Sequence, residues 1–278
     1  MQIKIFTMVK NETDIIDEWV FYHGSLFDYK NIYIIDNYSD DGTYEKLLRL
    51  KSIGINLYRK SDYKKKGEYM TWFYENFCNP DDIAYPIDID EFIVFFDKYS
   101  KQISIDKKTI ISYITNLPDA EIYKTNYINA MPNQYFPEGF KNAACECGLG
   151  IYDNNYKENA KSFMQKKLYS GKIDHGNHIP TNNYFMTSLC LVHFHTRNLE
   201  QIKKKIYCNV SGLGYDTNNL EQLKKIIKNN PLCDGAHHIV KWINILENNF
   251  TLPFYTFKKE GIDLSPLNNY IKKLYPNP

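Results

Sequence analysis

The sequence predicts an α/β fold, with one domain built on a mostly parallel central sheet and a helical segment at the C-terminus. In the N-terminal third, short apolar runs alternate with segments whose apolar residues recur at helical spacing. The helical segments are long enough to cross over between parallel strands. Apolar runs such as 31–36 lack a polar face, which is typical of a parallel strand covered on both sides.

The N-terminal half, residues 1–96, is expected to bind a nucleotide. We expect strands at 2–9, 31–36, 54–59 and 82–88, and helices at 11–27, 42–50 and 67–77. Asn11 is the expected N-cap of the first helix, with Asp14 three residues later in the position of a capping box. Asp40 or Asp41 is the expected cap of the second helix.

The second half of the domain, residues 97–197, has a less regular pattern. We expect a helix at 107–117 and strands at 120–128, 161–169 and 183–196, while the prolines and glycines of 131–160 indicate a long loop. The C-terminal segment, 198–278, is expected to pack on the same domain, with helices near 198–208, 217–229 and 236–249.

The composition is that of a soluble globular protein. Of 278 residues, 43% are hydrophobic and 24% are charged, and the net charge of +1 gives no reason to expect a nucleic-acid partner. No signal peptide and no transmembrane segment are expected, so the predicted location is cytoplasmic. The six scattered cysteines, including the C-x-C of Cys145 and Cys147, are interpreted as reduced thiols rather than as a metal site.

Polar clusters follow three of the expected strands, at 9–12, 36–43 and 88–92. Ligands of open parallel sheets bind beyond the carboxyl ends of the strands, which is where these clusters should lie. The cluster at 36–43 can equally be a turn and helix cap, because Asp, Asn, Ser and Gly favour both. Asp36, however, directly follows the strand and can accept a hydrogen bond from a base or a ribose.

The acids of "DIDE" (88–91) interrupt an apolar stretch. In an extended segment Asp88 and Asp90 point the same way, and two carboxylates on one face repel unless a cation lies between them or one is protonated. Because Mn²⁺ and Mg²⁺ favour oxygen ligands and bridge to phosphates, we favour a divalent metal over a purely structural pair. Glu91 points to the other face and is expected to anchor the loop.

Five motifs carry a resemblance to a known family. They are K-N-E at 10–12, E-W-x-x-Y-H at 18–23, D-N-x-S-x-D-G-T at 36–43, D-x-D-E-F at 88–92 and H-F-H-T-R-N at 193–198. Together they resemble the glycosyltransferase family 2-like group, close to the family 92 proteins. The likeness is specific over residues 8–92 and weaker over 190–205.

The resemblance implies a GT-A (Rossmann-like) fold and transfer of a sugar from a nucleotide-sugar, with UDP as the expected nucleotide. The residues that it implies for the nucleotide-sugar are Val9, Lys10, Asn11, Glu12, Asp36, Asn37 and Asp88. It implies Asp88, Asp90 and His193 for Mn²⁺ or Mg²⁺, with His195 in reserve. Lys66 and Arg197 offer cations for the phosphates, although the basic run 64–66 can also be a solvated turn.

The expected activity is therefore a metal-dependent glycosyltransferase of the hexosyltransferase type. Its acceptor is a hydroxyl of a glycan, a lipid-linked molecule or a protein, and the family analogy implies inversion at the sugar carbon. Asp174 is the predicted catalytic base, with Glu146 as the alternative. Two other classes stay open: an inactive nucleotide-sugar-binding protein and a metal-dependent phosphohydrolase.

Overall fold

The chain forms an α/β structure around an 11-stranded mixed sheet, in a computed structural model that describes residues 1–131, 148–153, 160–197, 199–233, 235–250 and 261–274. The strand order is β3-β2-β1-β4-β9-β7-β10-β5-β6, and β8 and β11 extend the sheet from β7. The α/β class predicted from the sequence is confirmed. Among the described helices, none has the length and apolar composition that a membrane span requires.

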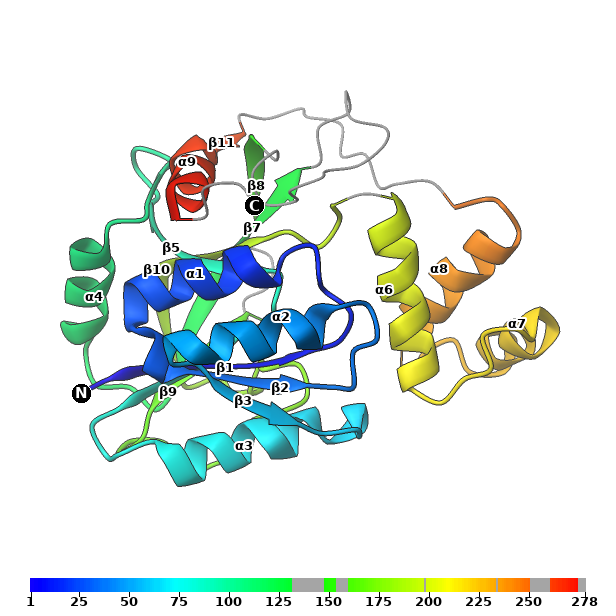
Figure 1. The fold of residues 1–278 in the computed structure, drawn as a ribbon, viewed down its shortest axis with the longest axis horizontal. Helices are drawn as coiled ribbons and strands as arrows, with labels where there is room; N and C mark the ends of the chain where they lie inside the picture. Colours follow the sequence, from blue (N-terminus) through cyan, green and yellow to red (C-terminus); the bar gives the residue numbers. More distant parts are fainter. Residues whose placement is uncertain (132–147, 154–159, 198, 234, 251–260, 275–278) are drawn as a thin grey trace.

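The N-terminal half follows the predicted alternation closely. Its strands are β1 (Ile3–Val9), β2 (Ile32–Asp36), β3 (Asn56–Arg59) and β4 (Ile83–Pro86), and its helices are α1 (Ile16–Phe27), α2 (Thr43–Leu50) and α3 (Lys66–Phe77). These four strands pair in parallel. Helices α1 and α2 cover one face of this part of the sheet and α3 covers the other (Figure 1), so both faces of β1 and β2 are buried.

The second half adds mainly antiparallel pairs. Its strands are β5 (Glu91–Asp97), β6 (Gln102–Ser104), β7 (Tyr123–Met131), β8 (Leu149–Asp153), β9 (Lys161–Gln165) and β10 (Phe185–His193), with α4 (Lys107–Thr115) between them. Strand β9 lies antiparallel between β4 and β7, and β10 runs parallel to β7 and antiparallel to β5. The expected loop at 131–160 therefore contains a strand, β8, which pairs with the end of β7.

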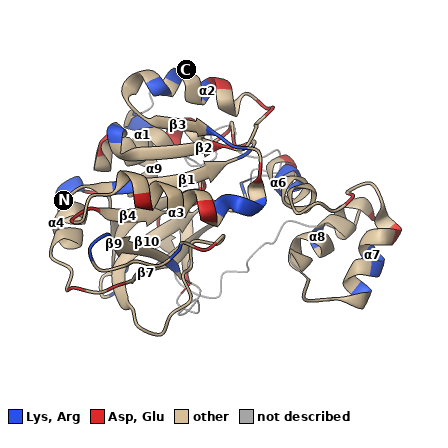
Figure 2. Ribbon diagram, turned by 90° about the horizontal axis from the view of Figure 1, so that it is seen from below, with Lys and Arg blue, Asp and Glu red and all other residues tan. Residues whose placement is uncertain are grey.

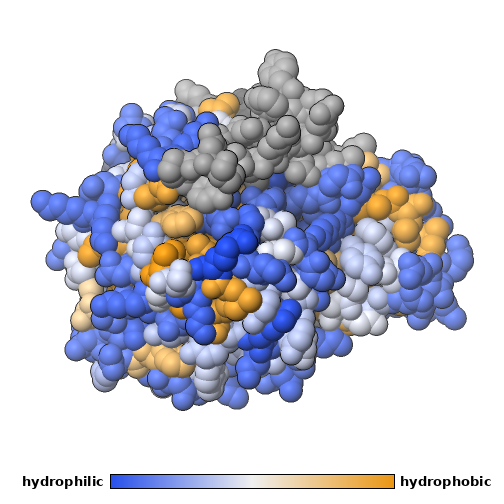
Figure 3. All heavy atoms as spheres, in the orientation of Figure 1, coloured by the Kyte–Doolittle hydropathy of each residue, from blue (hydrophilic) through white to orange (hydrophobic). Residues whose placement is uncertain are grey.

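The C-terminal segment divides between two places. Helices α6 (Leu199–Gly212), α7 (Leu220–Asn229) and α8 (Ala236–Leu246) share a small core of their own and project to one side of the sheet (Figure 2). An apolar patch lies toward the outer end of this helical group (Figure 3). Leu232, in the loop between α7 and α8, is 91% exposed. By contrast, β11 (Ile262–Asp263) pairs with β8, and α9 (Ser265–Leu274) packs against α1.

The predicted start of the first helix is wrong. Helix α1 begins at Ile16, five residues after the expected N-cap, and Asn11 has the left-handed φ of 57°. The Asn11 side chain instead accepts a hydrogen bond from the backbone N–H of Asp40 at 3.0 Å. Asp14 makes an ion pair with Arg197 rather than capping the helix. Residues 11–15 therefore belong to a loop between β1 and α1, whose side chains bond to the segments that follow β2 and β10.

Candidate functional site

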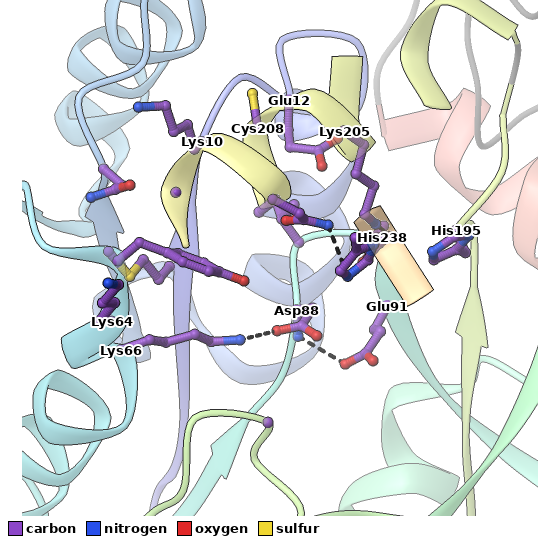
Figure 4. Close-up of a pocket in the computed structure, with 18 of the residues that line it drawn as sticks. Lys10, Glu12, Lys64, Lys66, Asp88, Glu91, His195, Lys205, Cys208 and His238 are labelled. Carbon is purple, nitrogen blue, oxygen red and sulfur yellow. Dashed lines mark hydrogen bonds and ion pairs between the residues drawn. The ribbon is translucent and has the colours of Figure 1, made fainter. Parts of the chain in front are cut away.

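A cavity of about 1030 Å³ lies at the carboxyl ends of β1, β2 and β4, as the sheet topology predicts. Its wall at the strand ends consists of Met8, Lys10, Glu12, Asn37, Asp88, Asp90 and Glu91. Strands β7, β9 and β10 and helices α3, α6 and α8 supply the facing wall, through residues that include Lys66, Tyr127, Asn129, Lys161, His193, His195, Lys205 and His238 (Figure 4). The cavity thus joins segments that are far apart in the sequence.

Asp88 and Asp90 lie on a turn between β4 and β5, not on an extended strand as predicted. The backbone N–H of Glu91 donates to the carbonyl oxygen of Asp88 at 3.1 Å, which closes the turn. In return the Glu91 carboxylate accepts the backbone N–H of Asp88 at 2.8 Å. This contact gives Glu91 the anchoring role expected for it. The turn places Asp88, Asp90 and Glu91 on the same cavity.

Helix α1 holds this acidic turn through three aromatic side chains. The Trp19 indole N–H donates to the carbonyl oxygens of Glu91 and Asp88, at 2.9 and 3.2 Å. The Tyr22 hydroxyl donates to the carbonyl oxygen of Ile93 at 2.5 Å. His23 donates from Nδ1 to the Trp19 carbonyl oxygen and accepts the Ile93 N–H at Nε2. The E-W-x-x-Y-H motif therefore fixes the backbone of the turn.

Lysines supply the positive charge beside the three acids. Lys66 at the start of α3 lies 2.5 Å from one Asp88 carboxylate oxygen, and Lys161 of β9 lies 2.7 Å from the other. Lys161 also approaches Glu91 at 3.5 Å. Lys205 of α6 makes an ion pair with Asp90. The sequence prediction assigned the balancing charge to a divalent metal, whereas the structure places three ammonium groups there.

These ion pairs decide the charge state of the turn. Burial alone would raise the pKa of Asp88, but the ammonium groups of Lys161 and Lys66 outweigh it and hold the pKa well below the usual range. Burial likewise opposes ionisation of Asp90, and Lys205 with His193 brings its pKa down. For Glu91 burial wins, so its pKa is raised despite Lys161. Asp88 and Asp90 are therefore anionic at neutral pH.

The predicted metal ligands share the cavity but do not form a metal site as arranged. His193 Nε2 lies 3.5 Å from the Asp90 oxygen that Lys205 also contacts. Both carboxylate oxygens of Asp88 are taken by lysines. His195 is half-buried, which lowers its pKa, and its ring contacts the hydroxyl of Thr196. Across the described ranges, no three His, Cys, Asp or Glu side chains are grouped so that they could hold a metal.

Nine residues were predicted to bind the nucleotide-sugar. Lys66 and Asp88 line the cavity, as described above, and so do three of the other seven. Lys10, Glu12 and Asn37 line it; Val9, Asn11, Asp36 and Arg197 do not. Asp36 is fully buried, accepts the backbone N–H of Ser39 and makes an ion pair with Arg59 at 2.9 Å. The predicted contact between Asp36 and a base therefore has no support in the structure.

Arg197 has a structural contact in place of the predicted phosphate contact. Its guanidinium is fully buried and pairs with Glu12 and with Asp14, the latter at 2.7 Å. Burial opposes the charge of this guanidinium, but the two carboxylates outweigh that effect and raise its pKa. The H-x-H-T-R-N motif thus ties the end of β10 to the loop after β1.

The predicted base, Asp174, does not line the cavity. Its carboxylate accepts the backbone N–H of His178 at 2.6 Å. From this loop, Gly176 and His178 line the cavity instead. Glu146 and both cysteines of the C-x-C lie outside the described residues. The four cysteines in the described part of the chain are free thiols.

Sequence reasoning missed Lys161 and Lys205. Lys161 begins an apolar strand, and Lys205 belongs to a run of three lysines that is also typical of a solvated helix face. Their partners are 73 and 115 residues away along the chain. A weak signal was available, because three acids in an apolar stretch require nearby cations.

No protein-family model and no curated protein matches the sequence. Among solved structures, S. aureus TarS in complex with UDP aligns over 99% of this chain and 88% of its own, at 11% identity and a TM-score of 0.45. Glucosyl-3-phosphoglycerate synthase from Mycobacterium tuberculosis with Mg²⁺ and UDP aligns over 77% of this chain and 80% of its own, at 12% identity and a TM-score of 0.40. The assignment to family 92 has no support in these comparisons. They amount to a structural likeness to GT-A glycosyltransferases at low sequence identity.

Proposed function

We propose that the protein is a glycosyltransferase that moves a sugar from a nucleotide-sugar, with UDP as the nucleotide, to a hydroxyl group. The observation that carries the proposal is the meeting of the K-N-E, D-N and D-I-D-E segments around one cavity at the carboxyl edge of the parallel strands. That edge is where open α/β sheets bind nucleotides. The assignment of UDP rests on the motif resemblance.

The cavity is large enough for both reactants. Pockets for small molecules typically span about 300–1,000 Å³, and this one reaches the upper end of that range. We assign the donor to the wall formed by Lys10, Asn37, Lys66 and Asp88. The acceptor is then assigned to the wall of β7 and β10, where Tyr127, Asn129 and His193 provide an aromatic ring and polar groups.

In the proposed reaction, the bond between the anomeric carbon of the sugar and the diphosphate oxygen breaks. The diphosphate keeps the electron pair, and the acceptor oxygen forms the new bond at the opposite face of the carbon, with inversion. The proton of the acceptor hydroxyl leaves to a base. The lysines around the acidic turn lie where negative charge builds up on the departing diphosphate.

The described residues fit a divalent cation poorly. Mg²⁺ is normally held by one or two carboxylates plus phosphates. Here both carboxylate oxygens of Asp88 are occupied by Lys66 and Lys161, and one carboxylate oxygen of Asp90 is shared by Lys205 and His193. For this reason no step of the proposed reaction passes through a metal. The same arrangement disfavours a metal-dependent phosphohydrolase, whose metal site would need several free carboxylates.

The test is turnover of UDP-, GDP- and CMP-sugars, followed as release of the nucleotide with and without simple sugar acceptors. We expect UDP-sugars to be hydrolysed slowly alone and consumed faster with an acceptor. Tight UDP binding with no turnover under any condition would support the binding-protein alternative. Absence of binding to every nucleotide would contradict the proposed function.

The role of Asp174 as base stays a prediction. Loss of a general base lowers turnover by about 10²–10⁴-fold while leaving donor binding intact. Asp174→Asn should show this drop in kcat if the prediction holds. Because Asp174 also holds the backbone of His178, a fall in UDP affinity together with kcat would instead identify a structural role.

A further inference from the structure

The acidic turn is matched by lysines from three separate elements, of which Lys66 and Lys161 are buried and Lys205 is half-buried. The side chains of Lys66, Lys161 and Lys205 are 8%, 3% and 19% exposed. Lys161 also donates to the carbonyl oxygen of Gly176 at 2.8 Å, so its position is fixed by more than charge. Burying an ammonium group is costly unless it is paired, so these lysines hold defined positions beside the turn.

Each of the three lysines has a carboxylate at ion-pair distance. Lys161 lies between Asp88 and Glu91, at 2.7 and 3.5 Å, and Lys205 reaches Asp90 from α6. A phosphate that enters this cavity therefore meets fixed positive charges next to the carboxylates.

Two more lysines on the cavity wall carry charge that is not balanced. Lys10 follows β1 and Lys64 precedes α3, and both line the cavity (Figure 4). Within the described part of the chain, neither makes an ion pair, in contrast to Lys66, Lys161 and Lys205. In a nucleotide-sugar each of the two phosphates carries a negative charge. The two unbalanced ammonium groups therefore match the charge of the donor.

We propose that Lys10, Lys64, Lys66, Lys161 and Lys205 together bind the diphosphate of the donor, so that donor binding does not require a divalent cation. The unbalanced pair neutralises the bound donor. The three lysines beside the acidic turn, Lys66, Lys161 and Lys205, stabilise the further charge that the diphosphate gains when it leaves. This inference rests on the proposed function and changes its expected dependence on Mn²⁺ or Mg²⁺.

Calorimetry of the full chain with UDP tests the proposal, once in EDTA and once with excess Mn²⁺. We expect the two dissociation constants to agree within about twofold. A dissociation constant at least about tenfold weaker in EDTA would overturn the lysine proposal and leave the proposed function standing. Absence of UDP binding under both conditions would overturn the proposed function itself.

Lys205→Met, measured in EDTA, tests directly the lysine that pairs with Asp90. Loss of a charge-assisted hydrogen bond should weaken UDP binding by roughly 10- to 100-fold. The matched control is Lys203→Met on the same helix, because Lys203 makes an ion pair with Glu200 and does not line the cavity. The control should bind UDP as the wild type does. Equal affinity of Lys205→Met and wild type would contradict the proposal.

The same variant should gain a response to metal. In this variant the Asp90 carboxylate and His193 still lie 3.5 Å apart, but the ammonium group of Lys205 no longer occupies the Asp90 oxygen. A metal ion can then approach both side chains. We expect Mn²⁺ alone to bind Lys205→Met more tightly than the wild type, measured by calorimetry.

Lys10→Met provides a variant that keeps the fold, since Lys10 is exposed. It should weaken UDP binding in EDTA by about threefold or more, and no weakening would count against the proposal.

Discussion

The indole N–H of Trp19 on α1 donates to the carbonyl oxygen of Glu91, at 2.9 Å, in the turn that carries the site's acids. A second, longer bond joins it to the carbonyl oxygen of Asp88. The bond to Glu91 is buried, so the indole N–H satisfies a carbonyl oxygen in the interior, whereas the carbonyl oxygen of Asp88 also accepts the backbone N–H of Glu91. The position of the acidic turn therefore depends on a residue that does not line the cavity.

Trp19→Phe should destabilise the protein by about 1–3 kcal/mol, since it keeps an aromatic ring but removes the indole donor from the buried carbonyl oxygen of Glu91. Urea denaturation measures the change, and calorimetry with UDP should show weaker binding as well. The control is Trp72→Phe on α3, where Trp72 is 38% exposed and remote from the turn. If Trp19→Phe lowers the free energy of unfolding no more than this control does, the hydrogen bonds of the Trp19 indole contribute little to stability.

Gly67→Ala should disturb the loop that brings His178 to the cavity. A Cβ at this position would lie 2.8 Å from the backbone oxygen of Ile173 and 2.9 Å from the carbonyl carbon of Asp174. Backbone cannot yield cheaply, so we expect a loss of about 1–3 kcal/mol in the free energy of unfolding. Gly148→Ala is the matched control, because nothing lies within 4 Å of its Cβ. Equal effects of the two substitutions on urea denaturation would contradict this account of the loop.

His23 should make the stability depend on pH. Burial lowers its pKa from 6.5 to about 3, so the folded imidazole stays neutral while the unfolded chain takes up a proton below pH 6.5. The unfolded state then binds more protons, and stability falls as pH drops from 6.5 toward 3, by about 1.4 kcal/mol per pH unit for this residue. Urea denaturation at several pH values should show a shallower slope for His23→Gln than for the wild type. An unchanged slope would mean that His23 is protonated in the folded state.

Asp36→Asn should weaken the fold without altering the choice of nucleotide. The substitution removes the charge that faces Arg59, and a hydrogen bond to a charged group contributes about 1.5–3 kcal/mol. We expect reduced stability and an unchanged ratio of UDP to CDP affinity, measured by calorimetry. The exposed Asp40→Asn, four residues later, should alter neither quantity. A selective loss of UDP affinity in Asp36→Asn would restore the sequence-based assignment of Asp36 to the uracil.

The sequence by itself determined the elements whose signals are local. The four parallel strands and their crossover helices follow from apolar periodicity, and this places the clusters after β1, β2 and β4 at one sheet edge. The acids of the turn also predicted that positive charge lies nearby, because burying an unpaired carboxylate is unfavourable in free energy. The apolar periodicity did not predict that α1 begins only at Ile16. Asn11 and Asp14 bond to residues far away in the sequence rather than to the start of the helix.

Only the tertiary structure decided which cations meet the acids. Lys66, Lys161 and Lys205 come from α3, β9 and α6, and nothing in their own surroundings in the sequence marks them as partners of Asp88 and Asp90. The pairing arises because β9 inserts antiparallel beside β4 and α6 follows β10 to the same edge of the sheet. An ion pair depends on distance in space, whereas the helix and strand patterns of a sequence report only on neighbours along the chain.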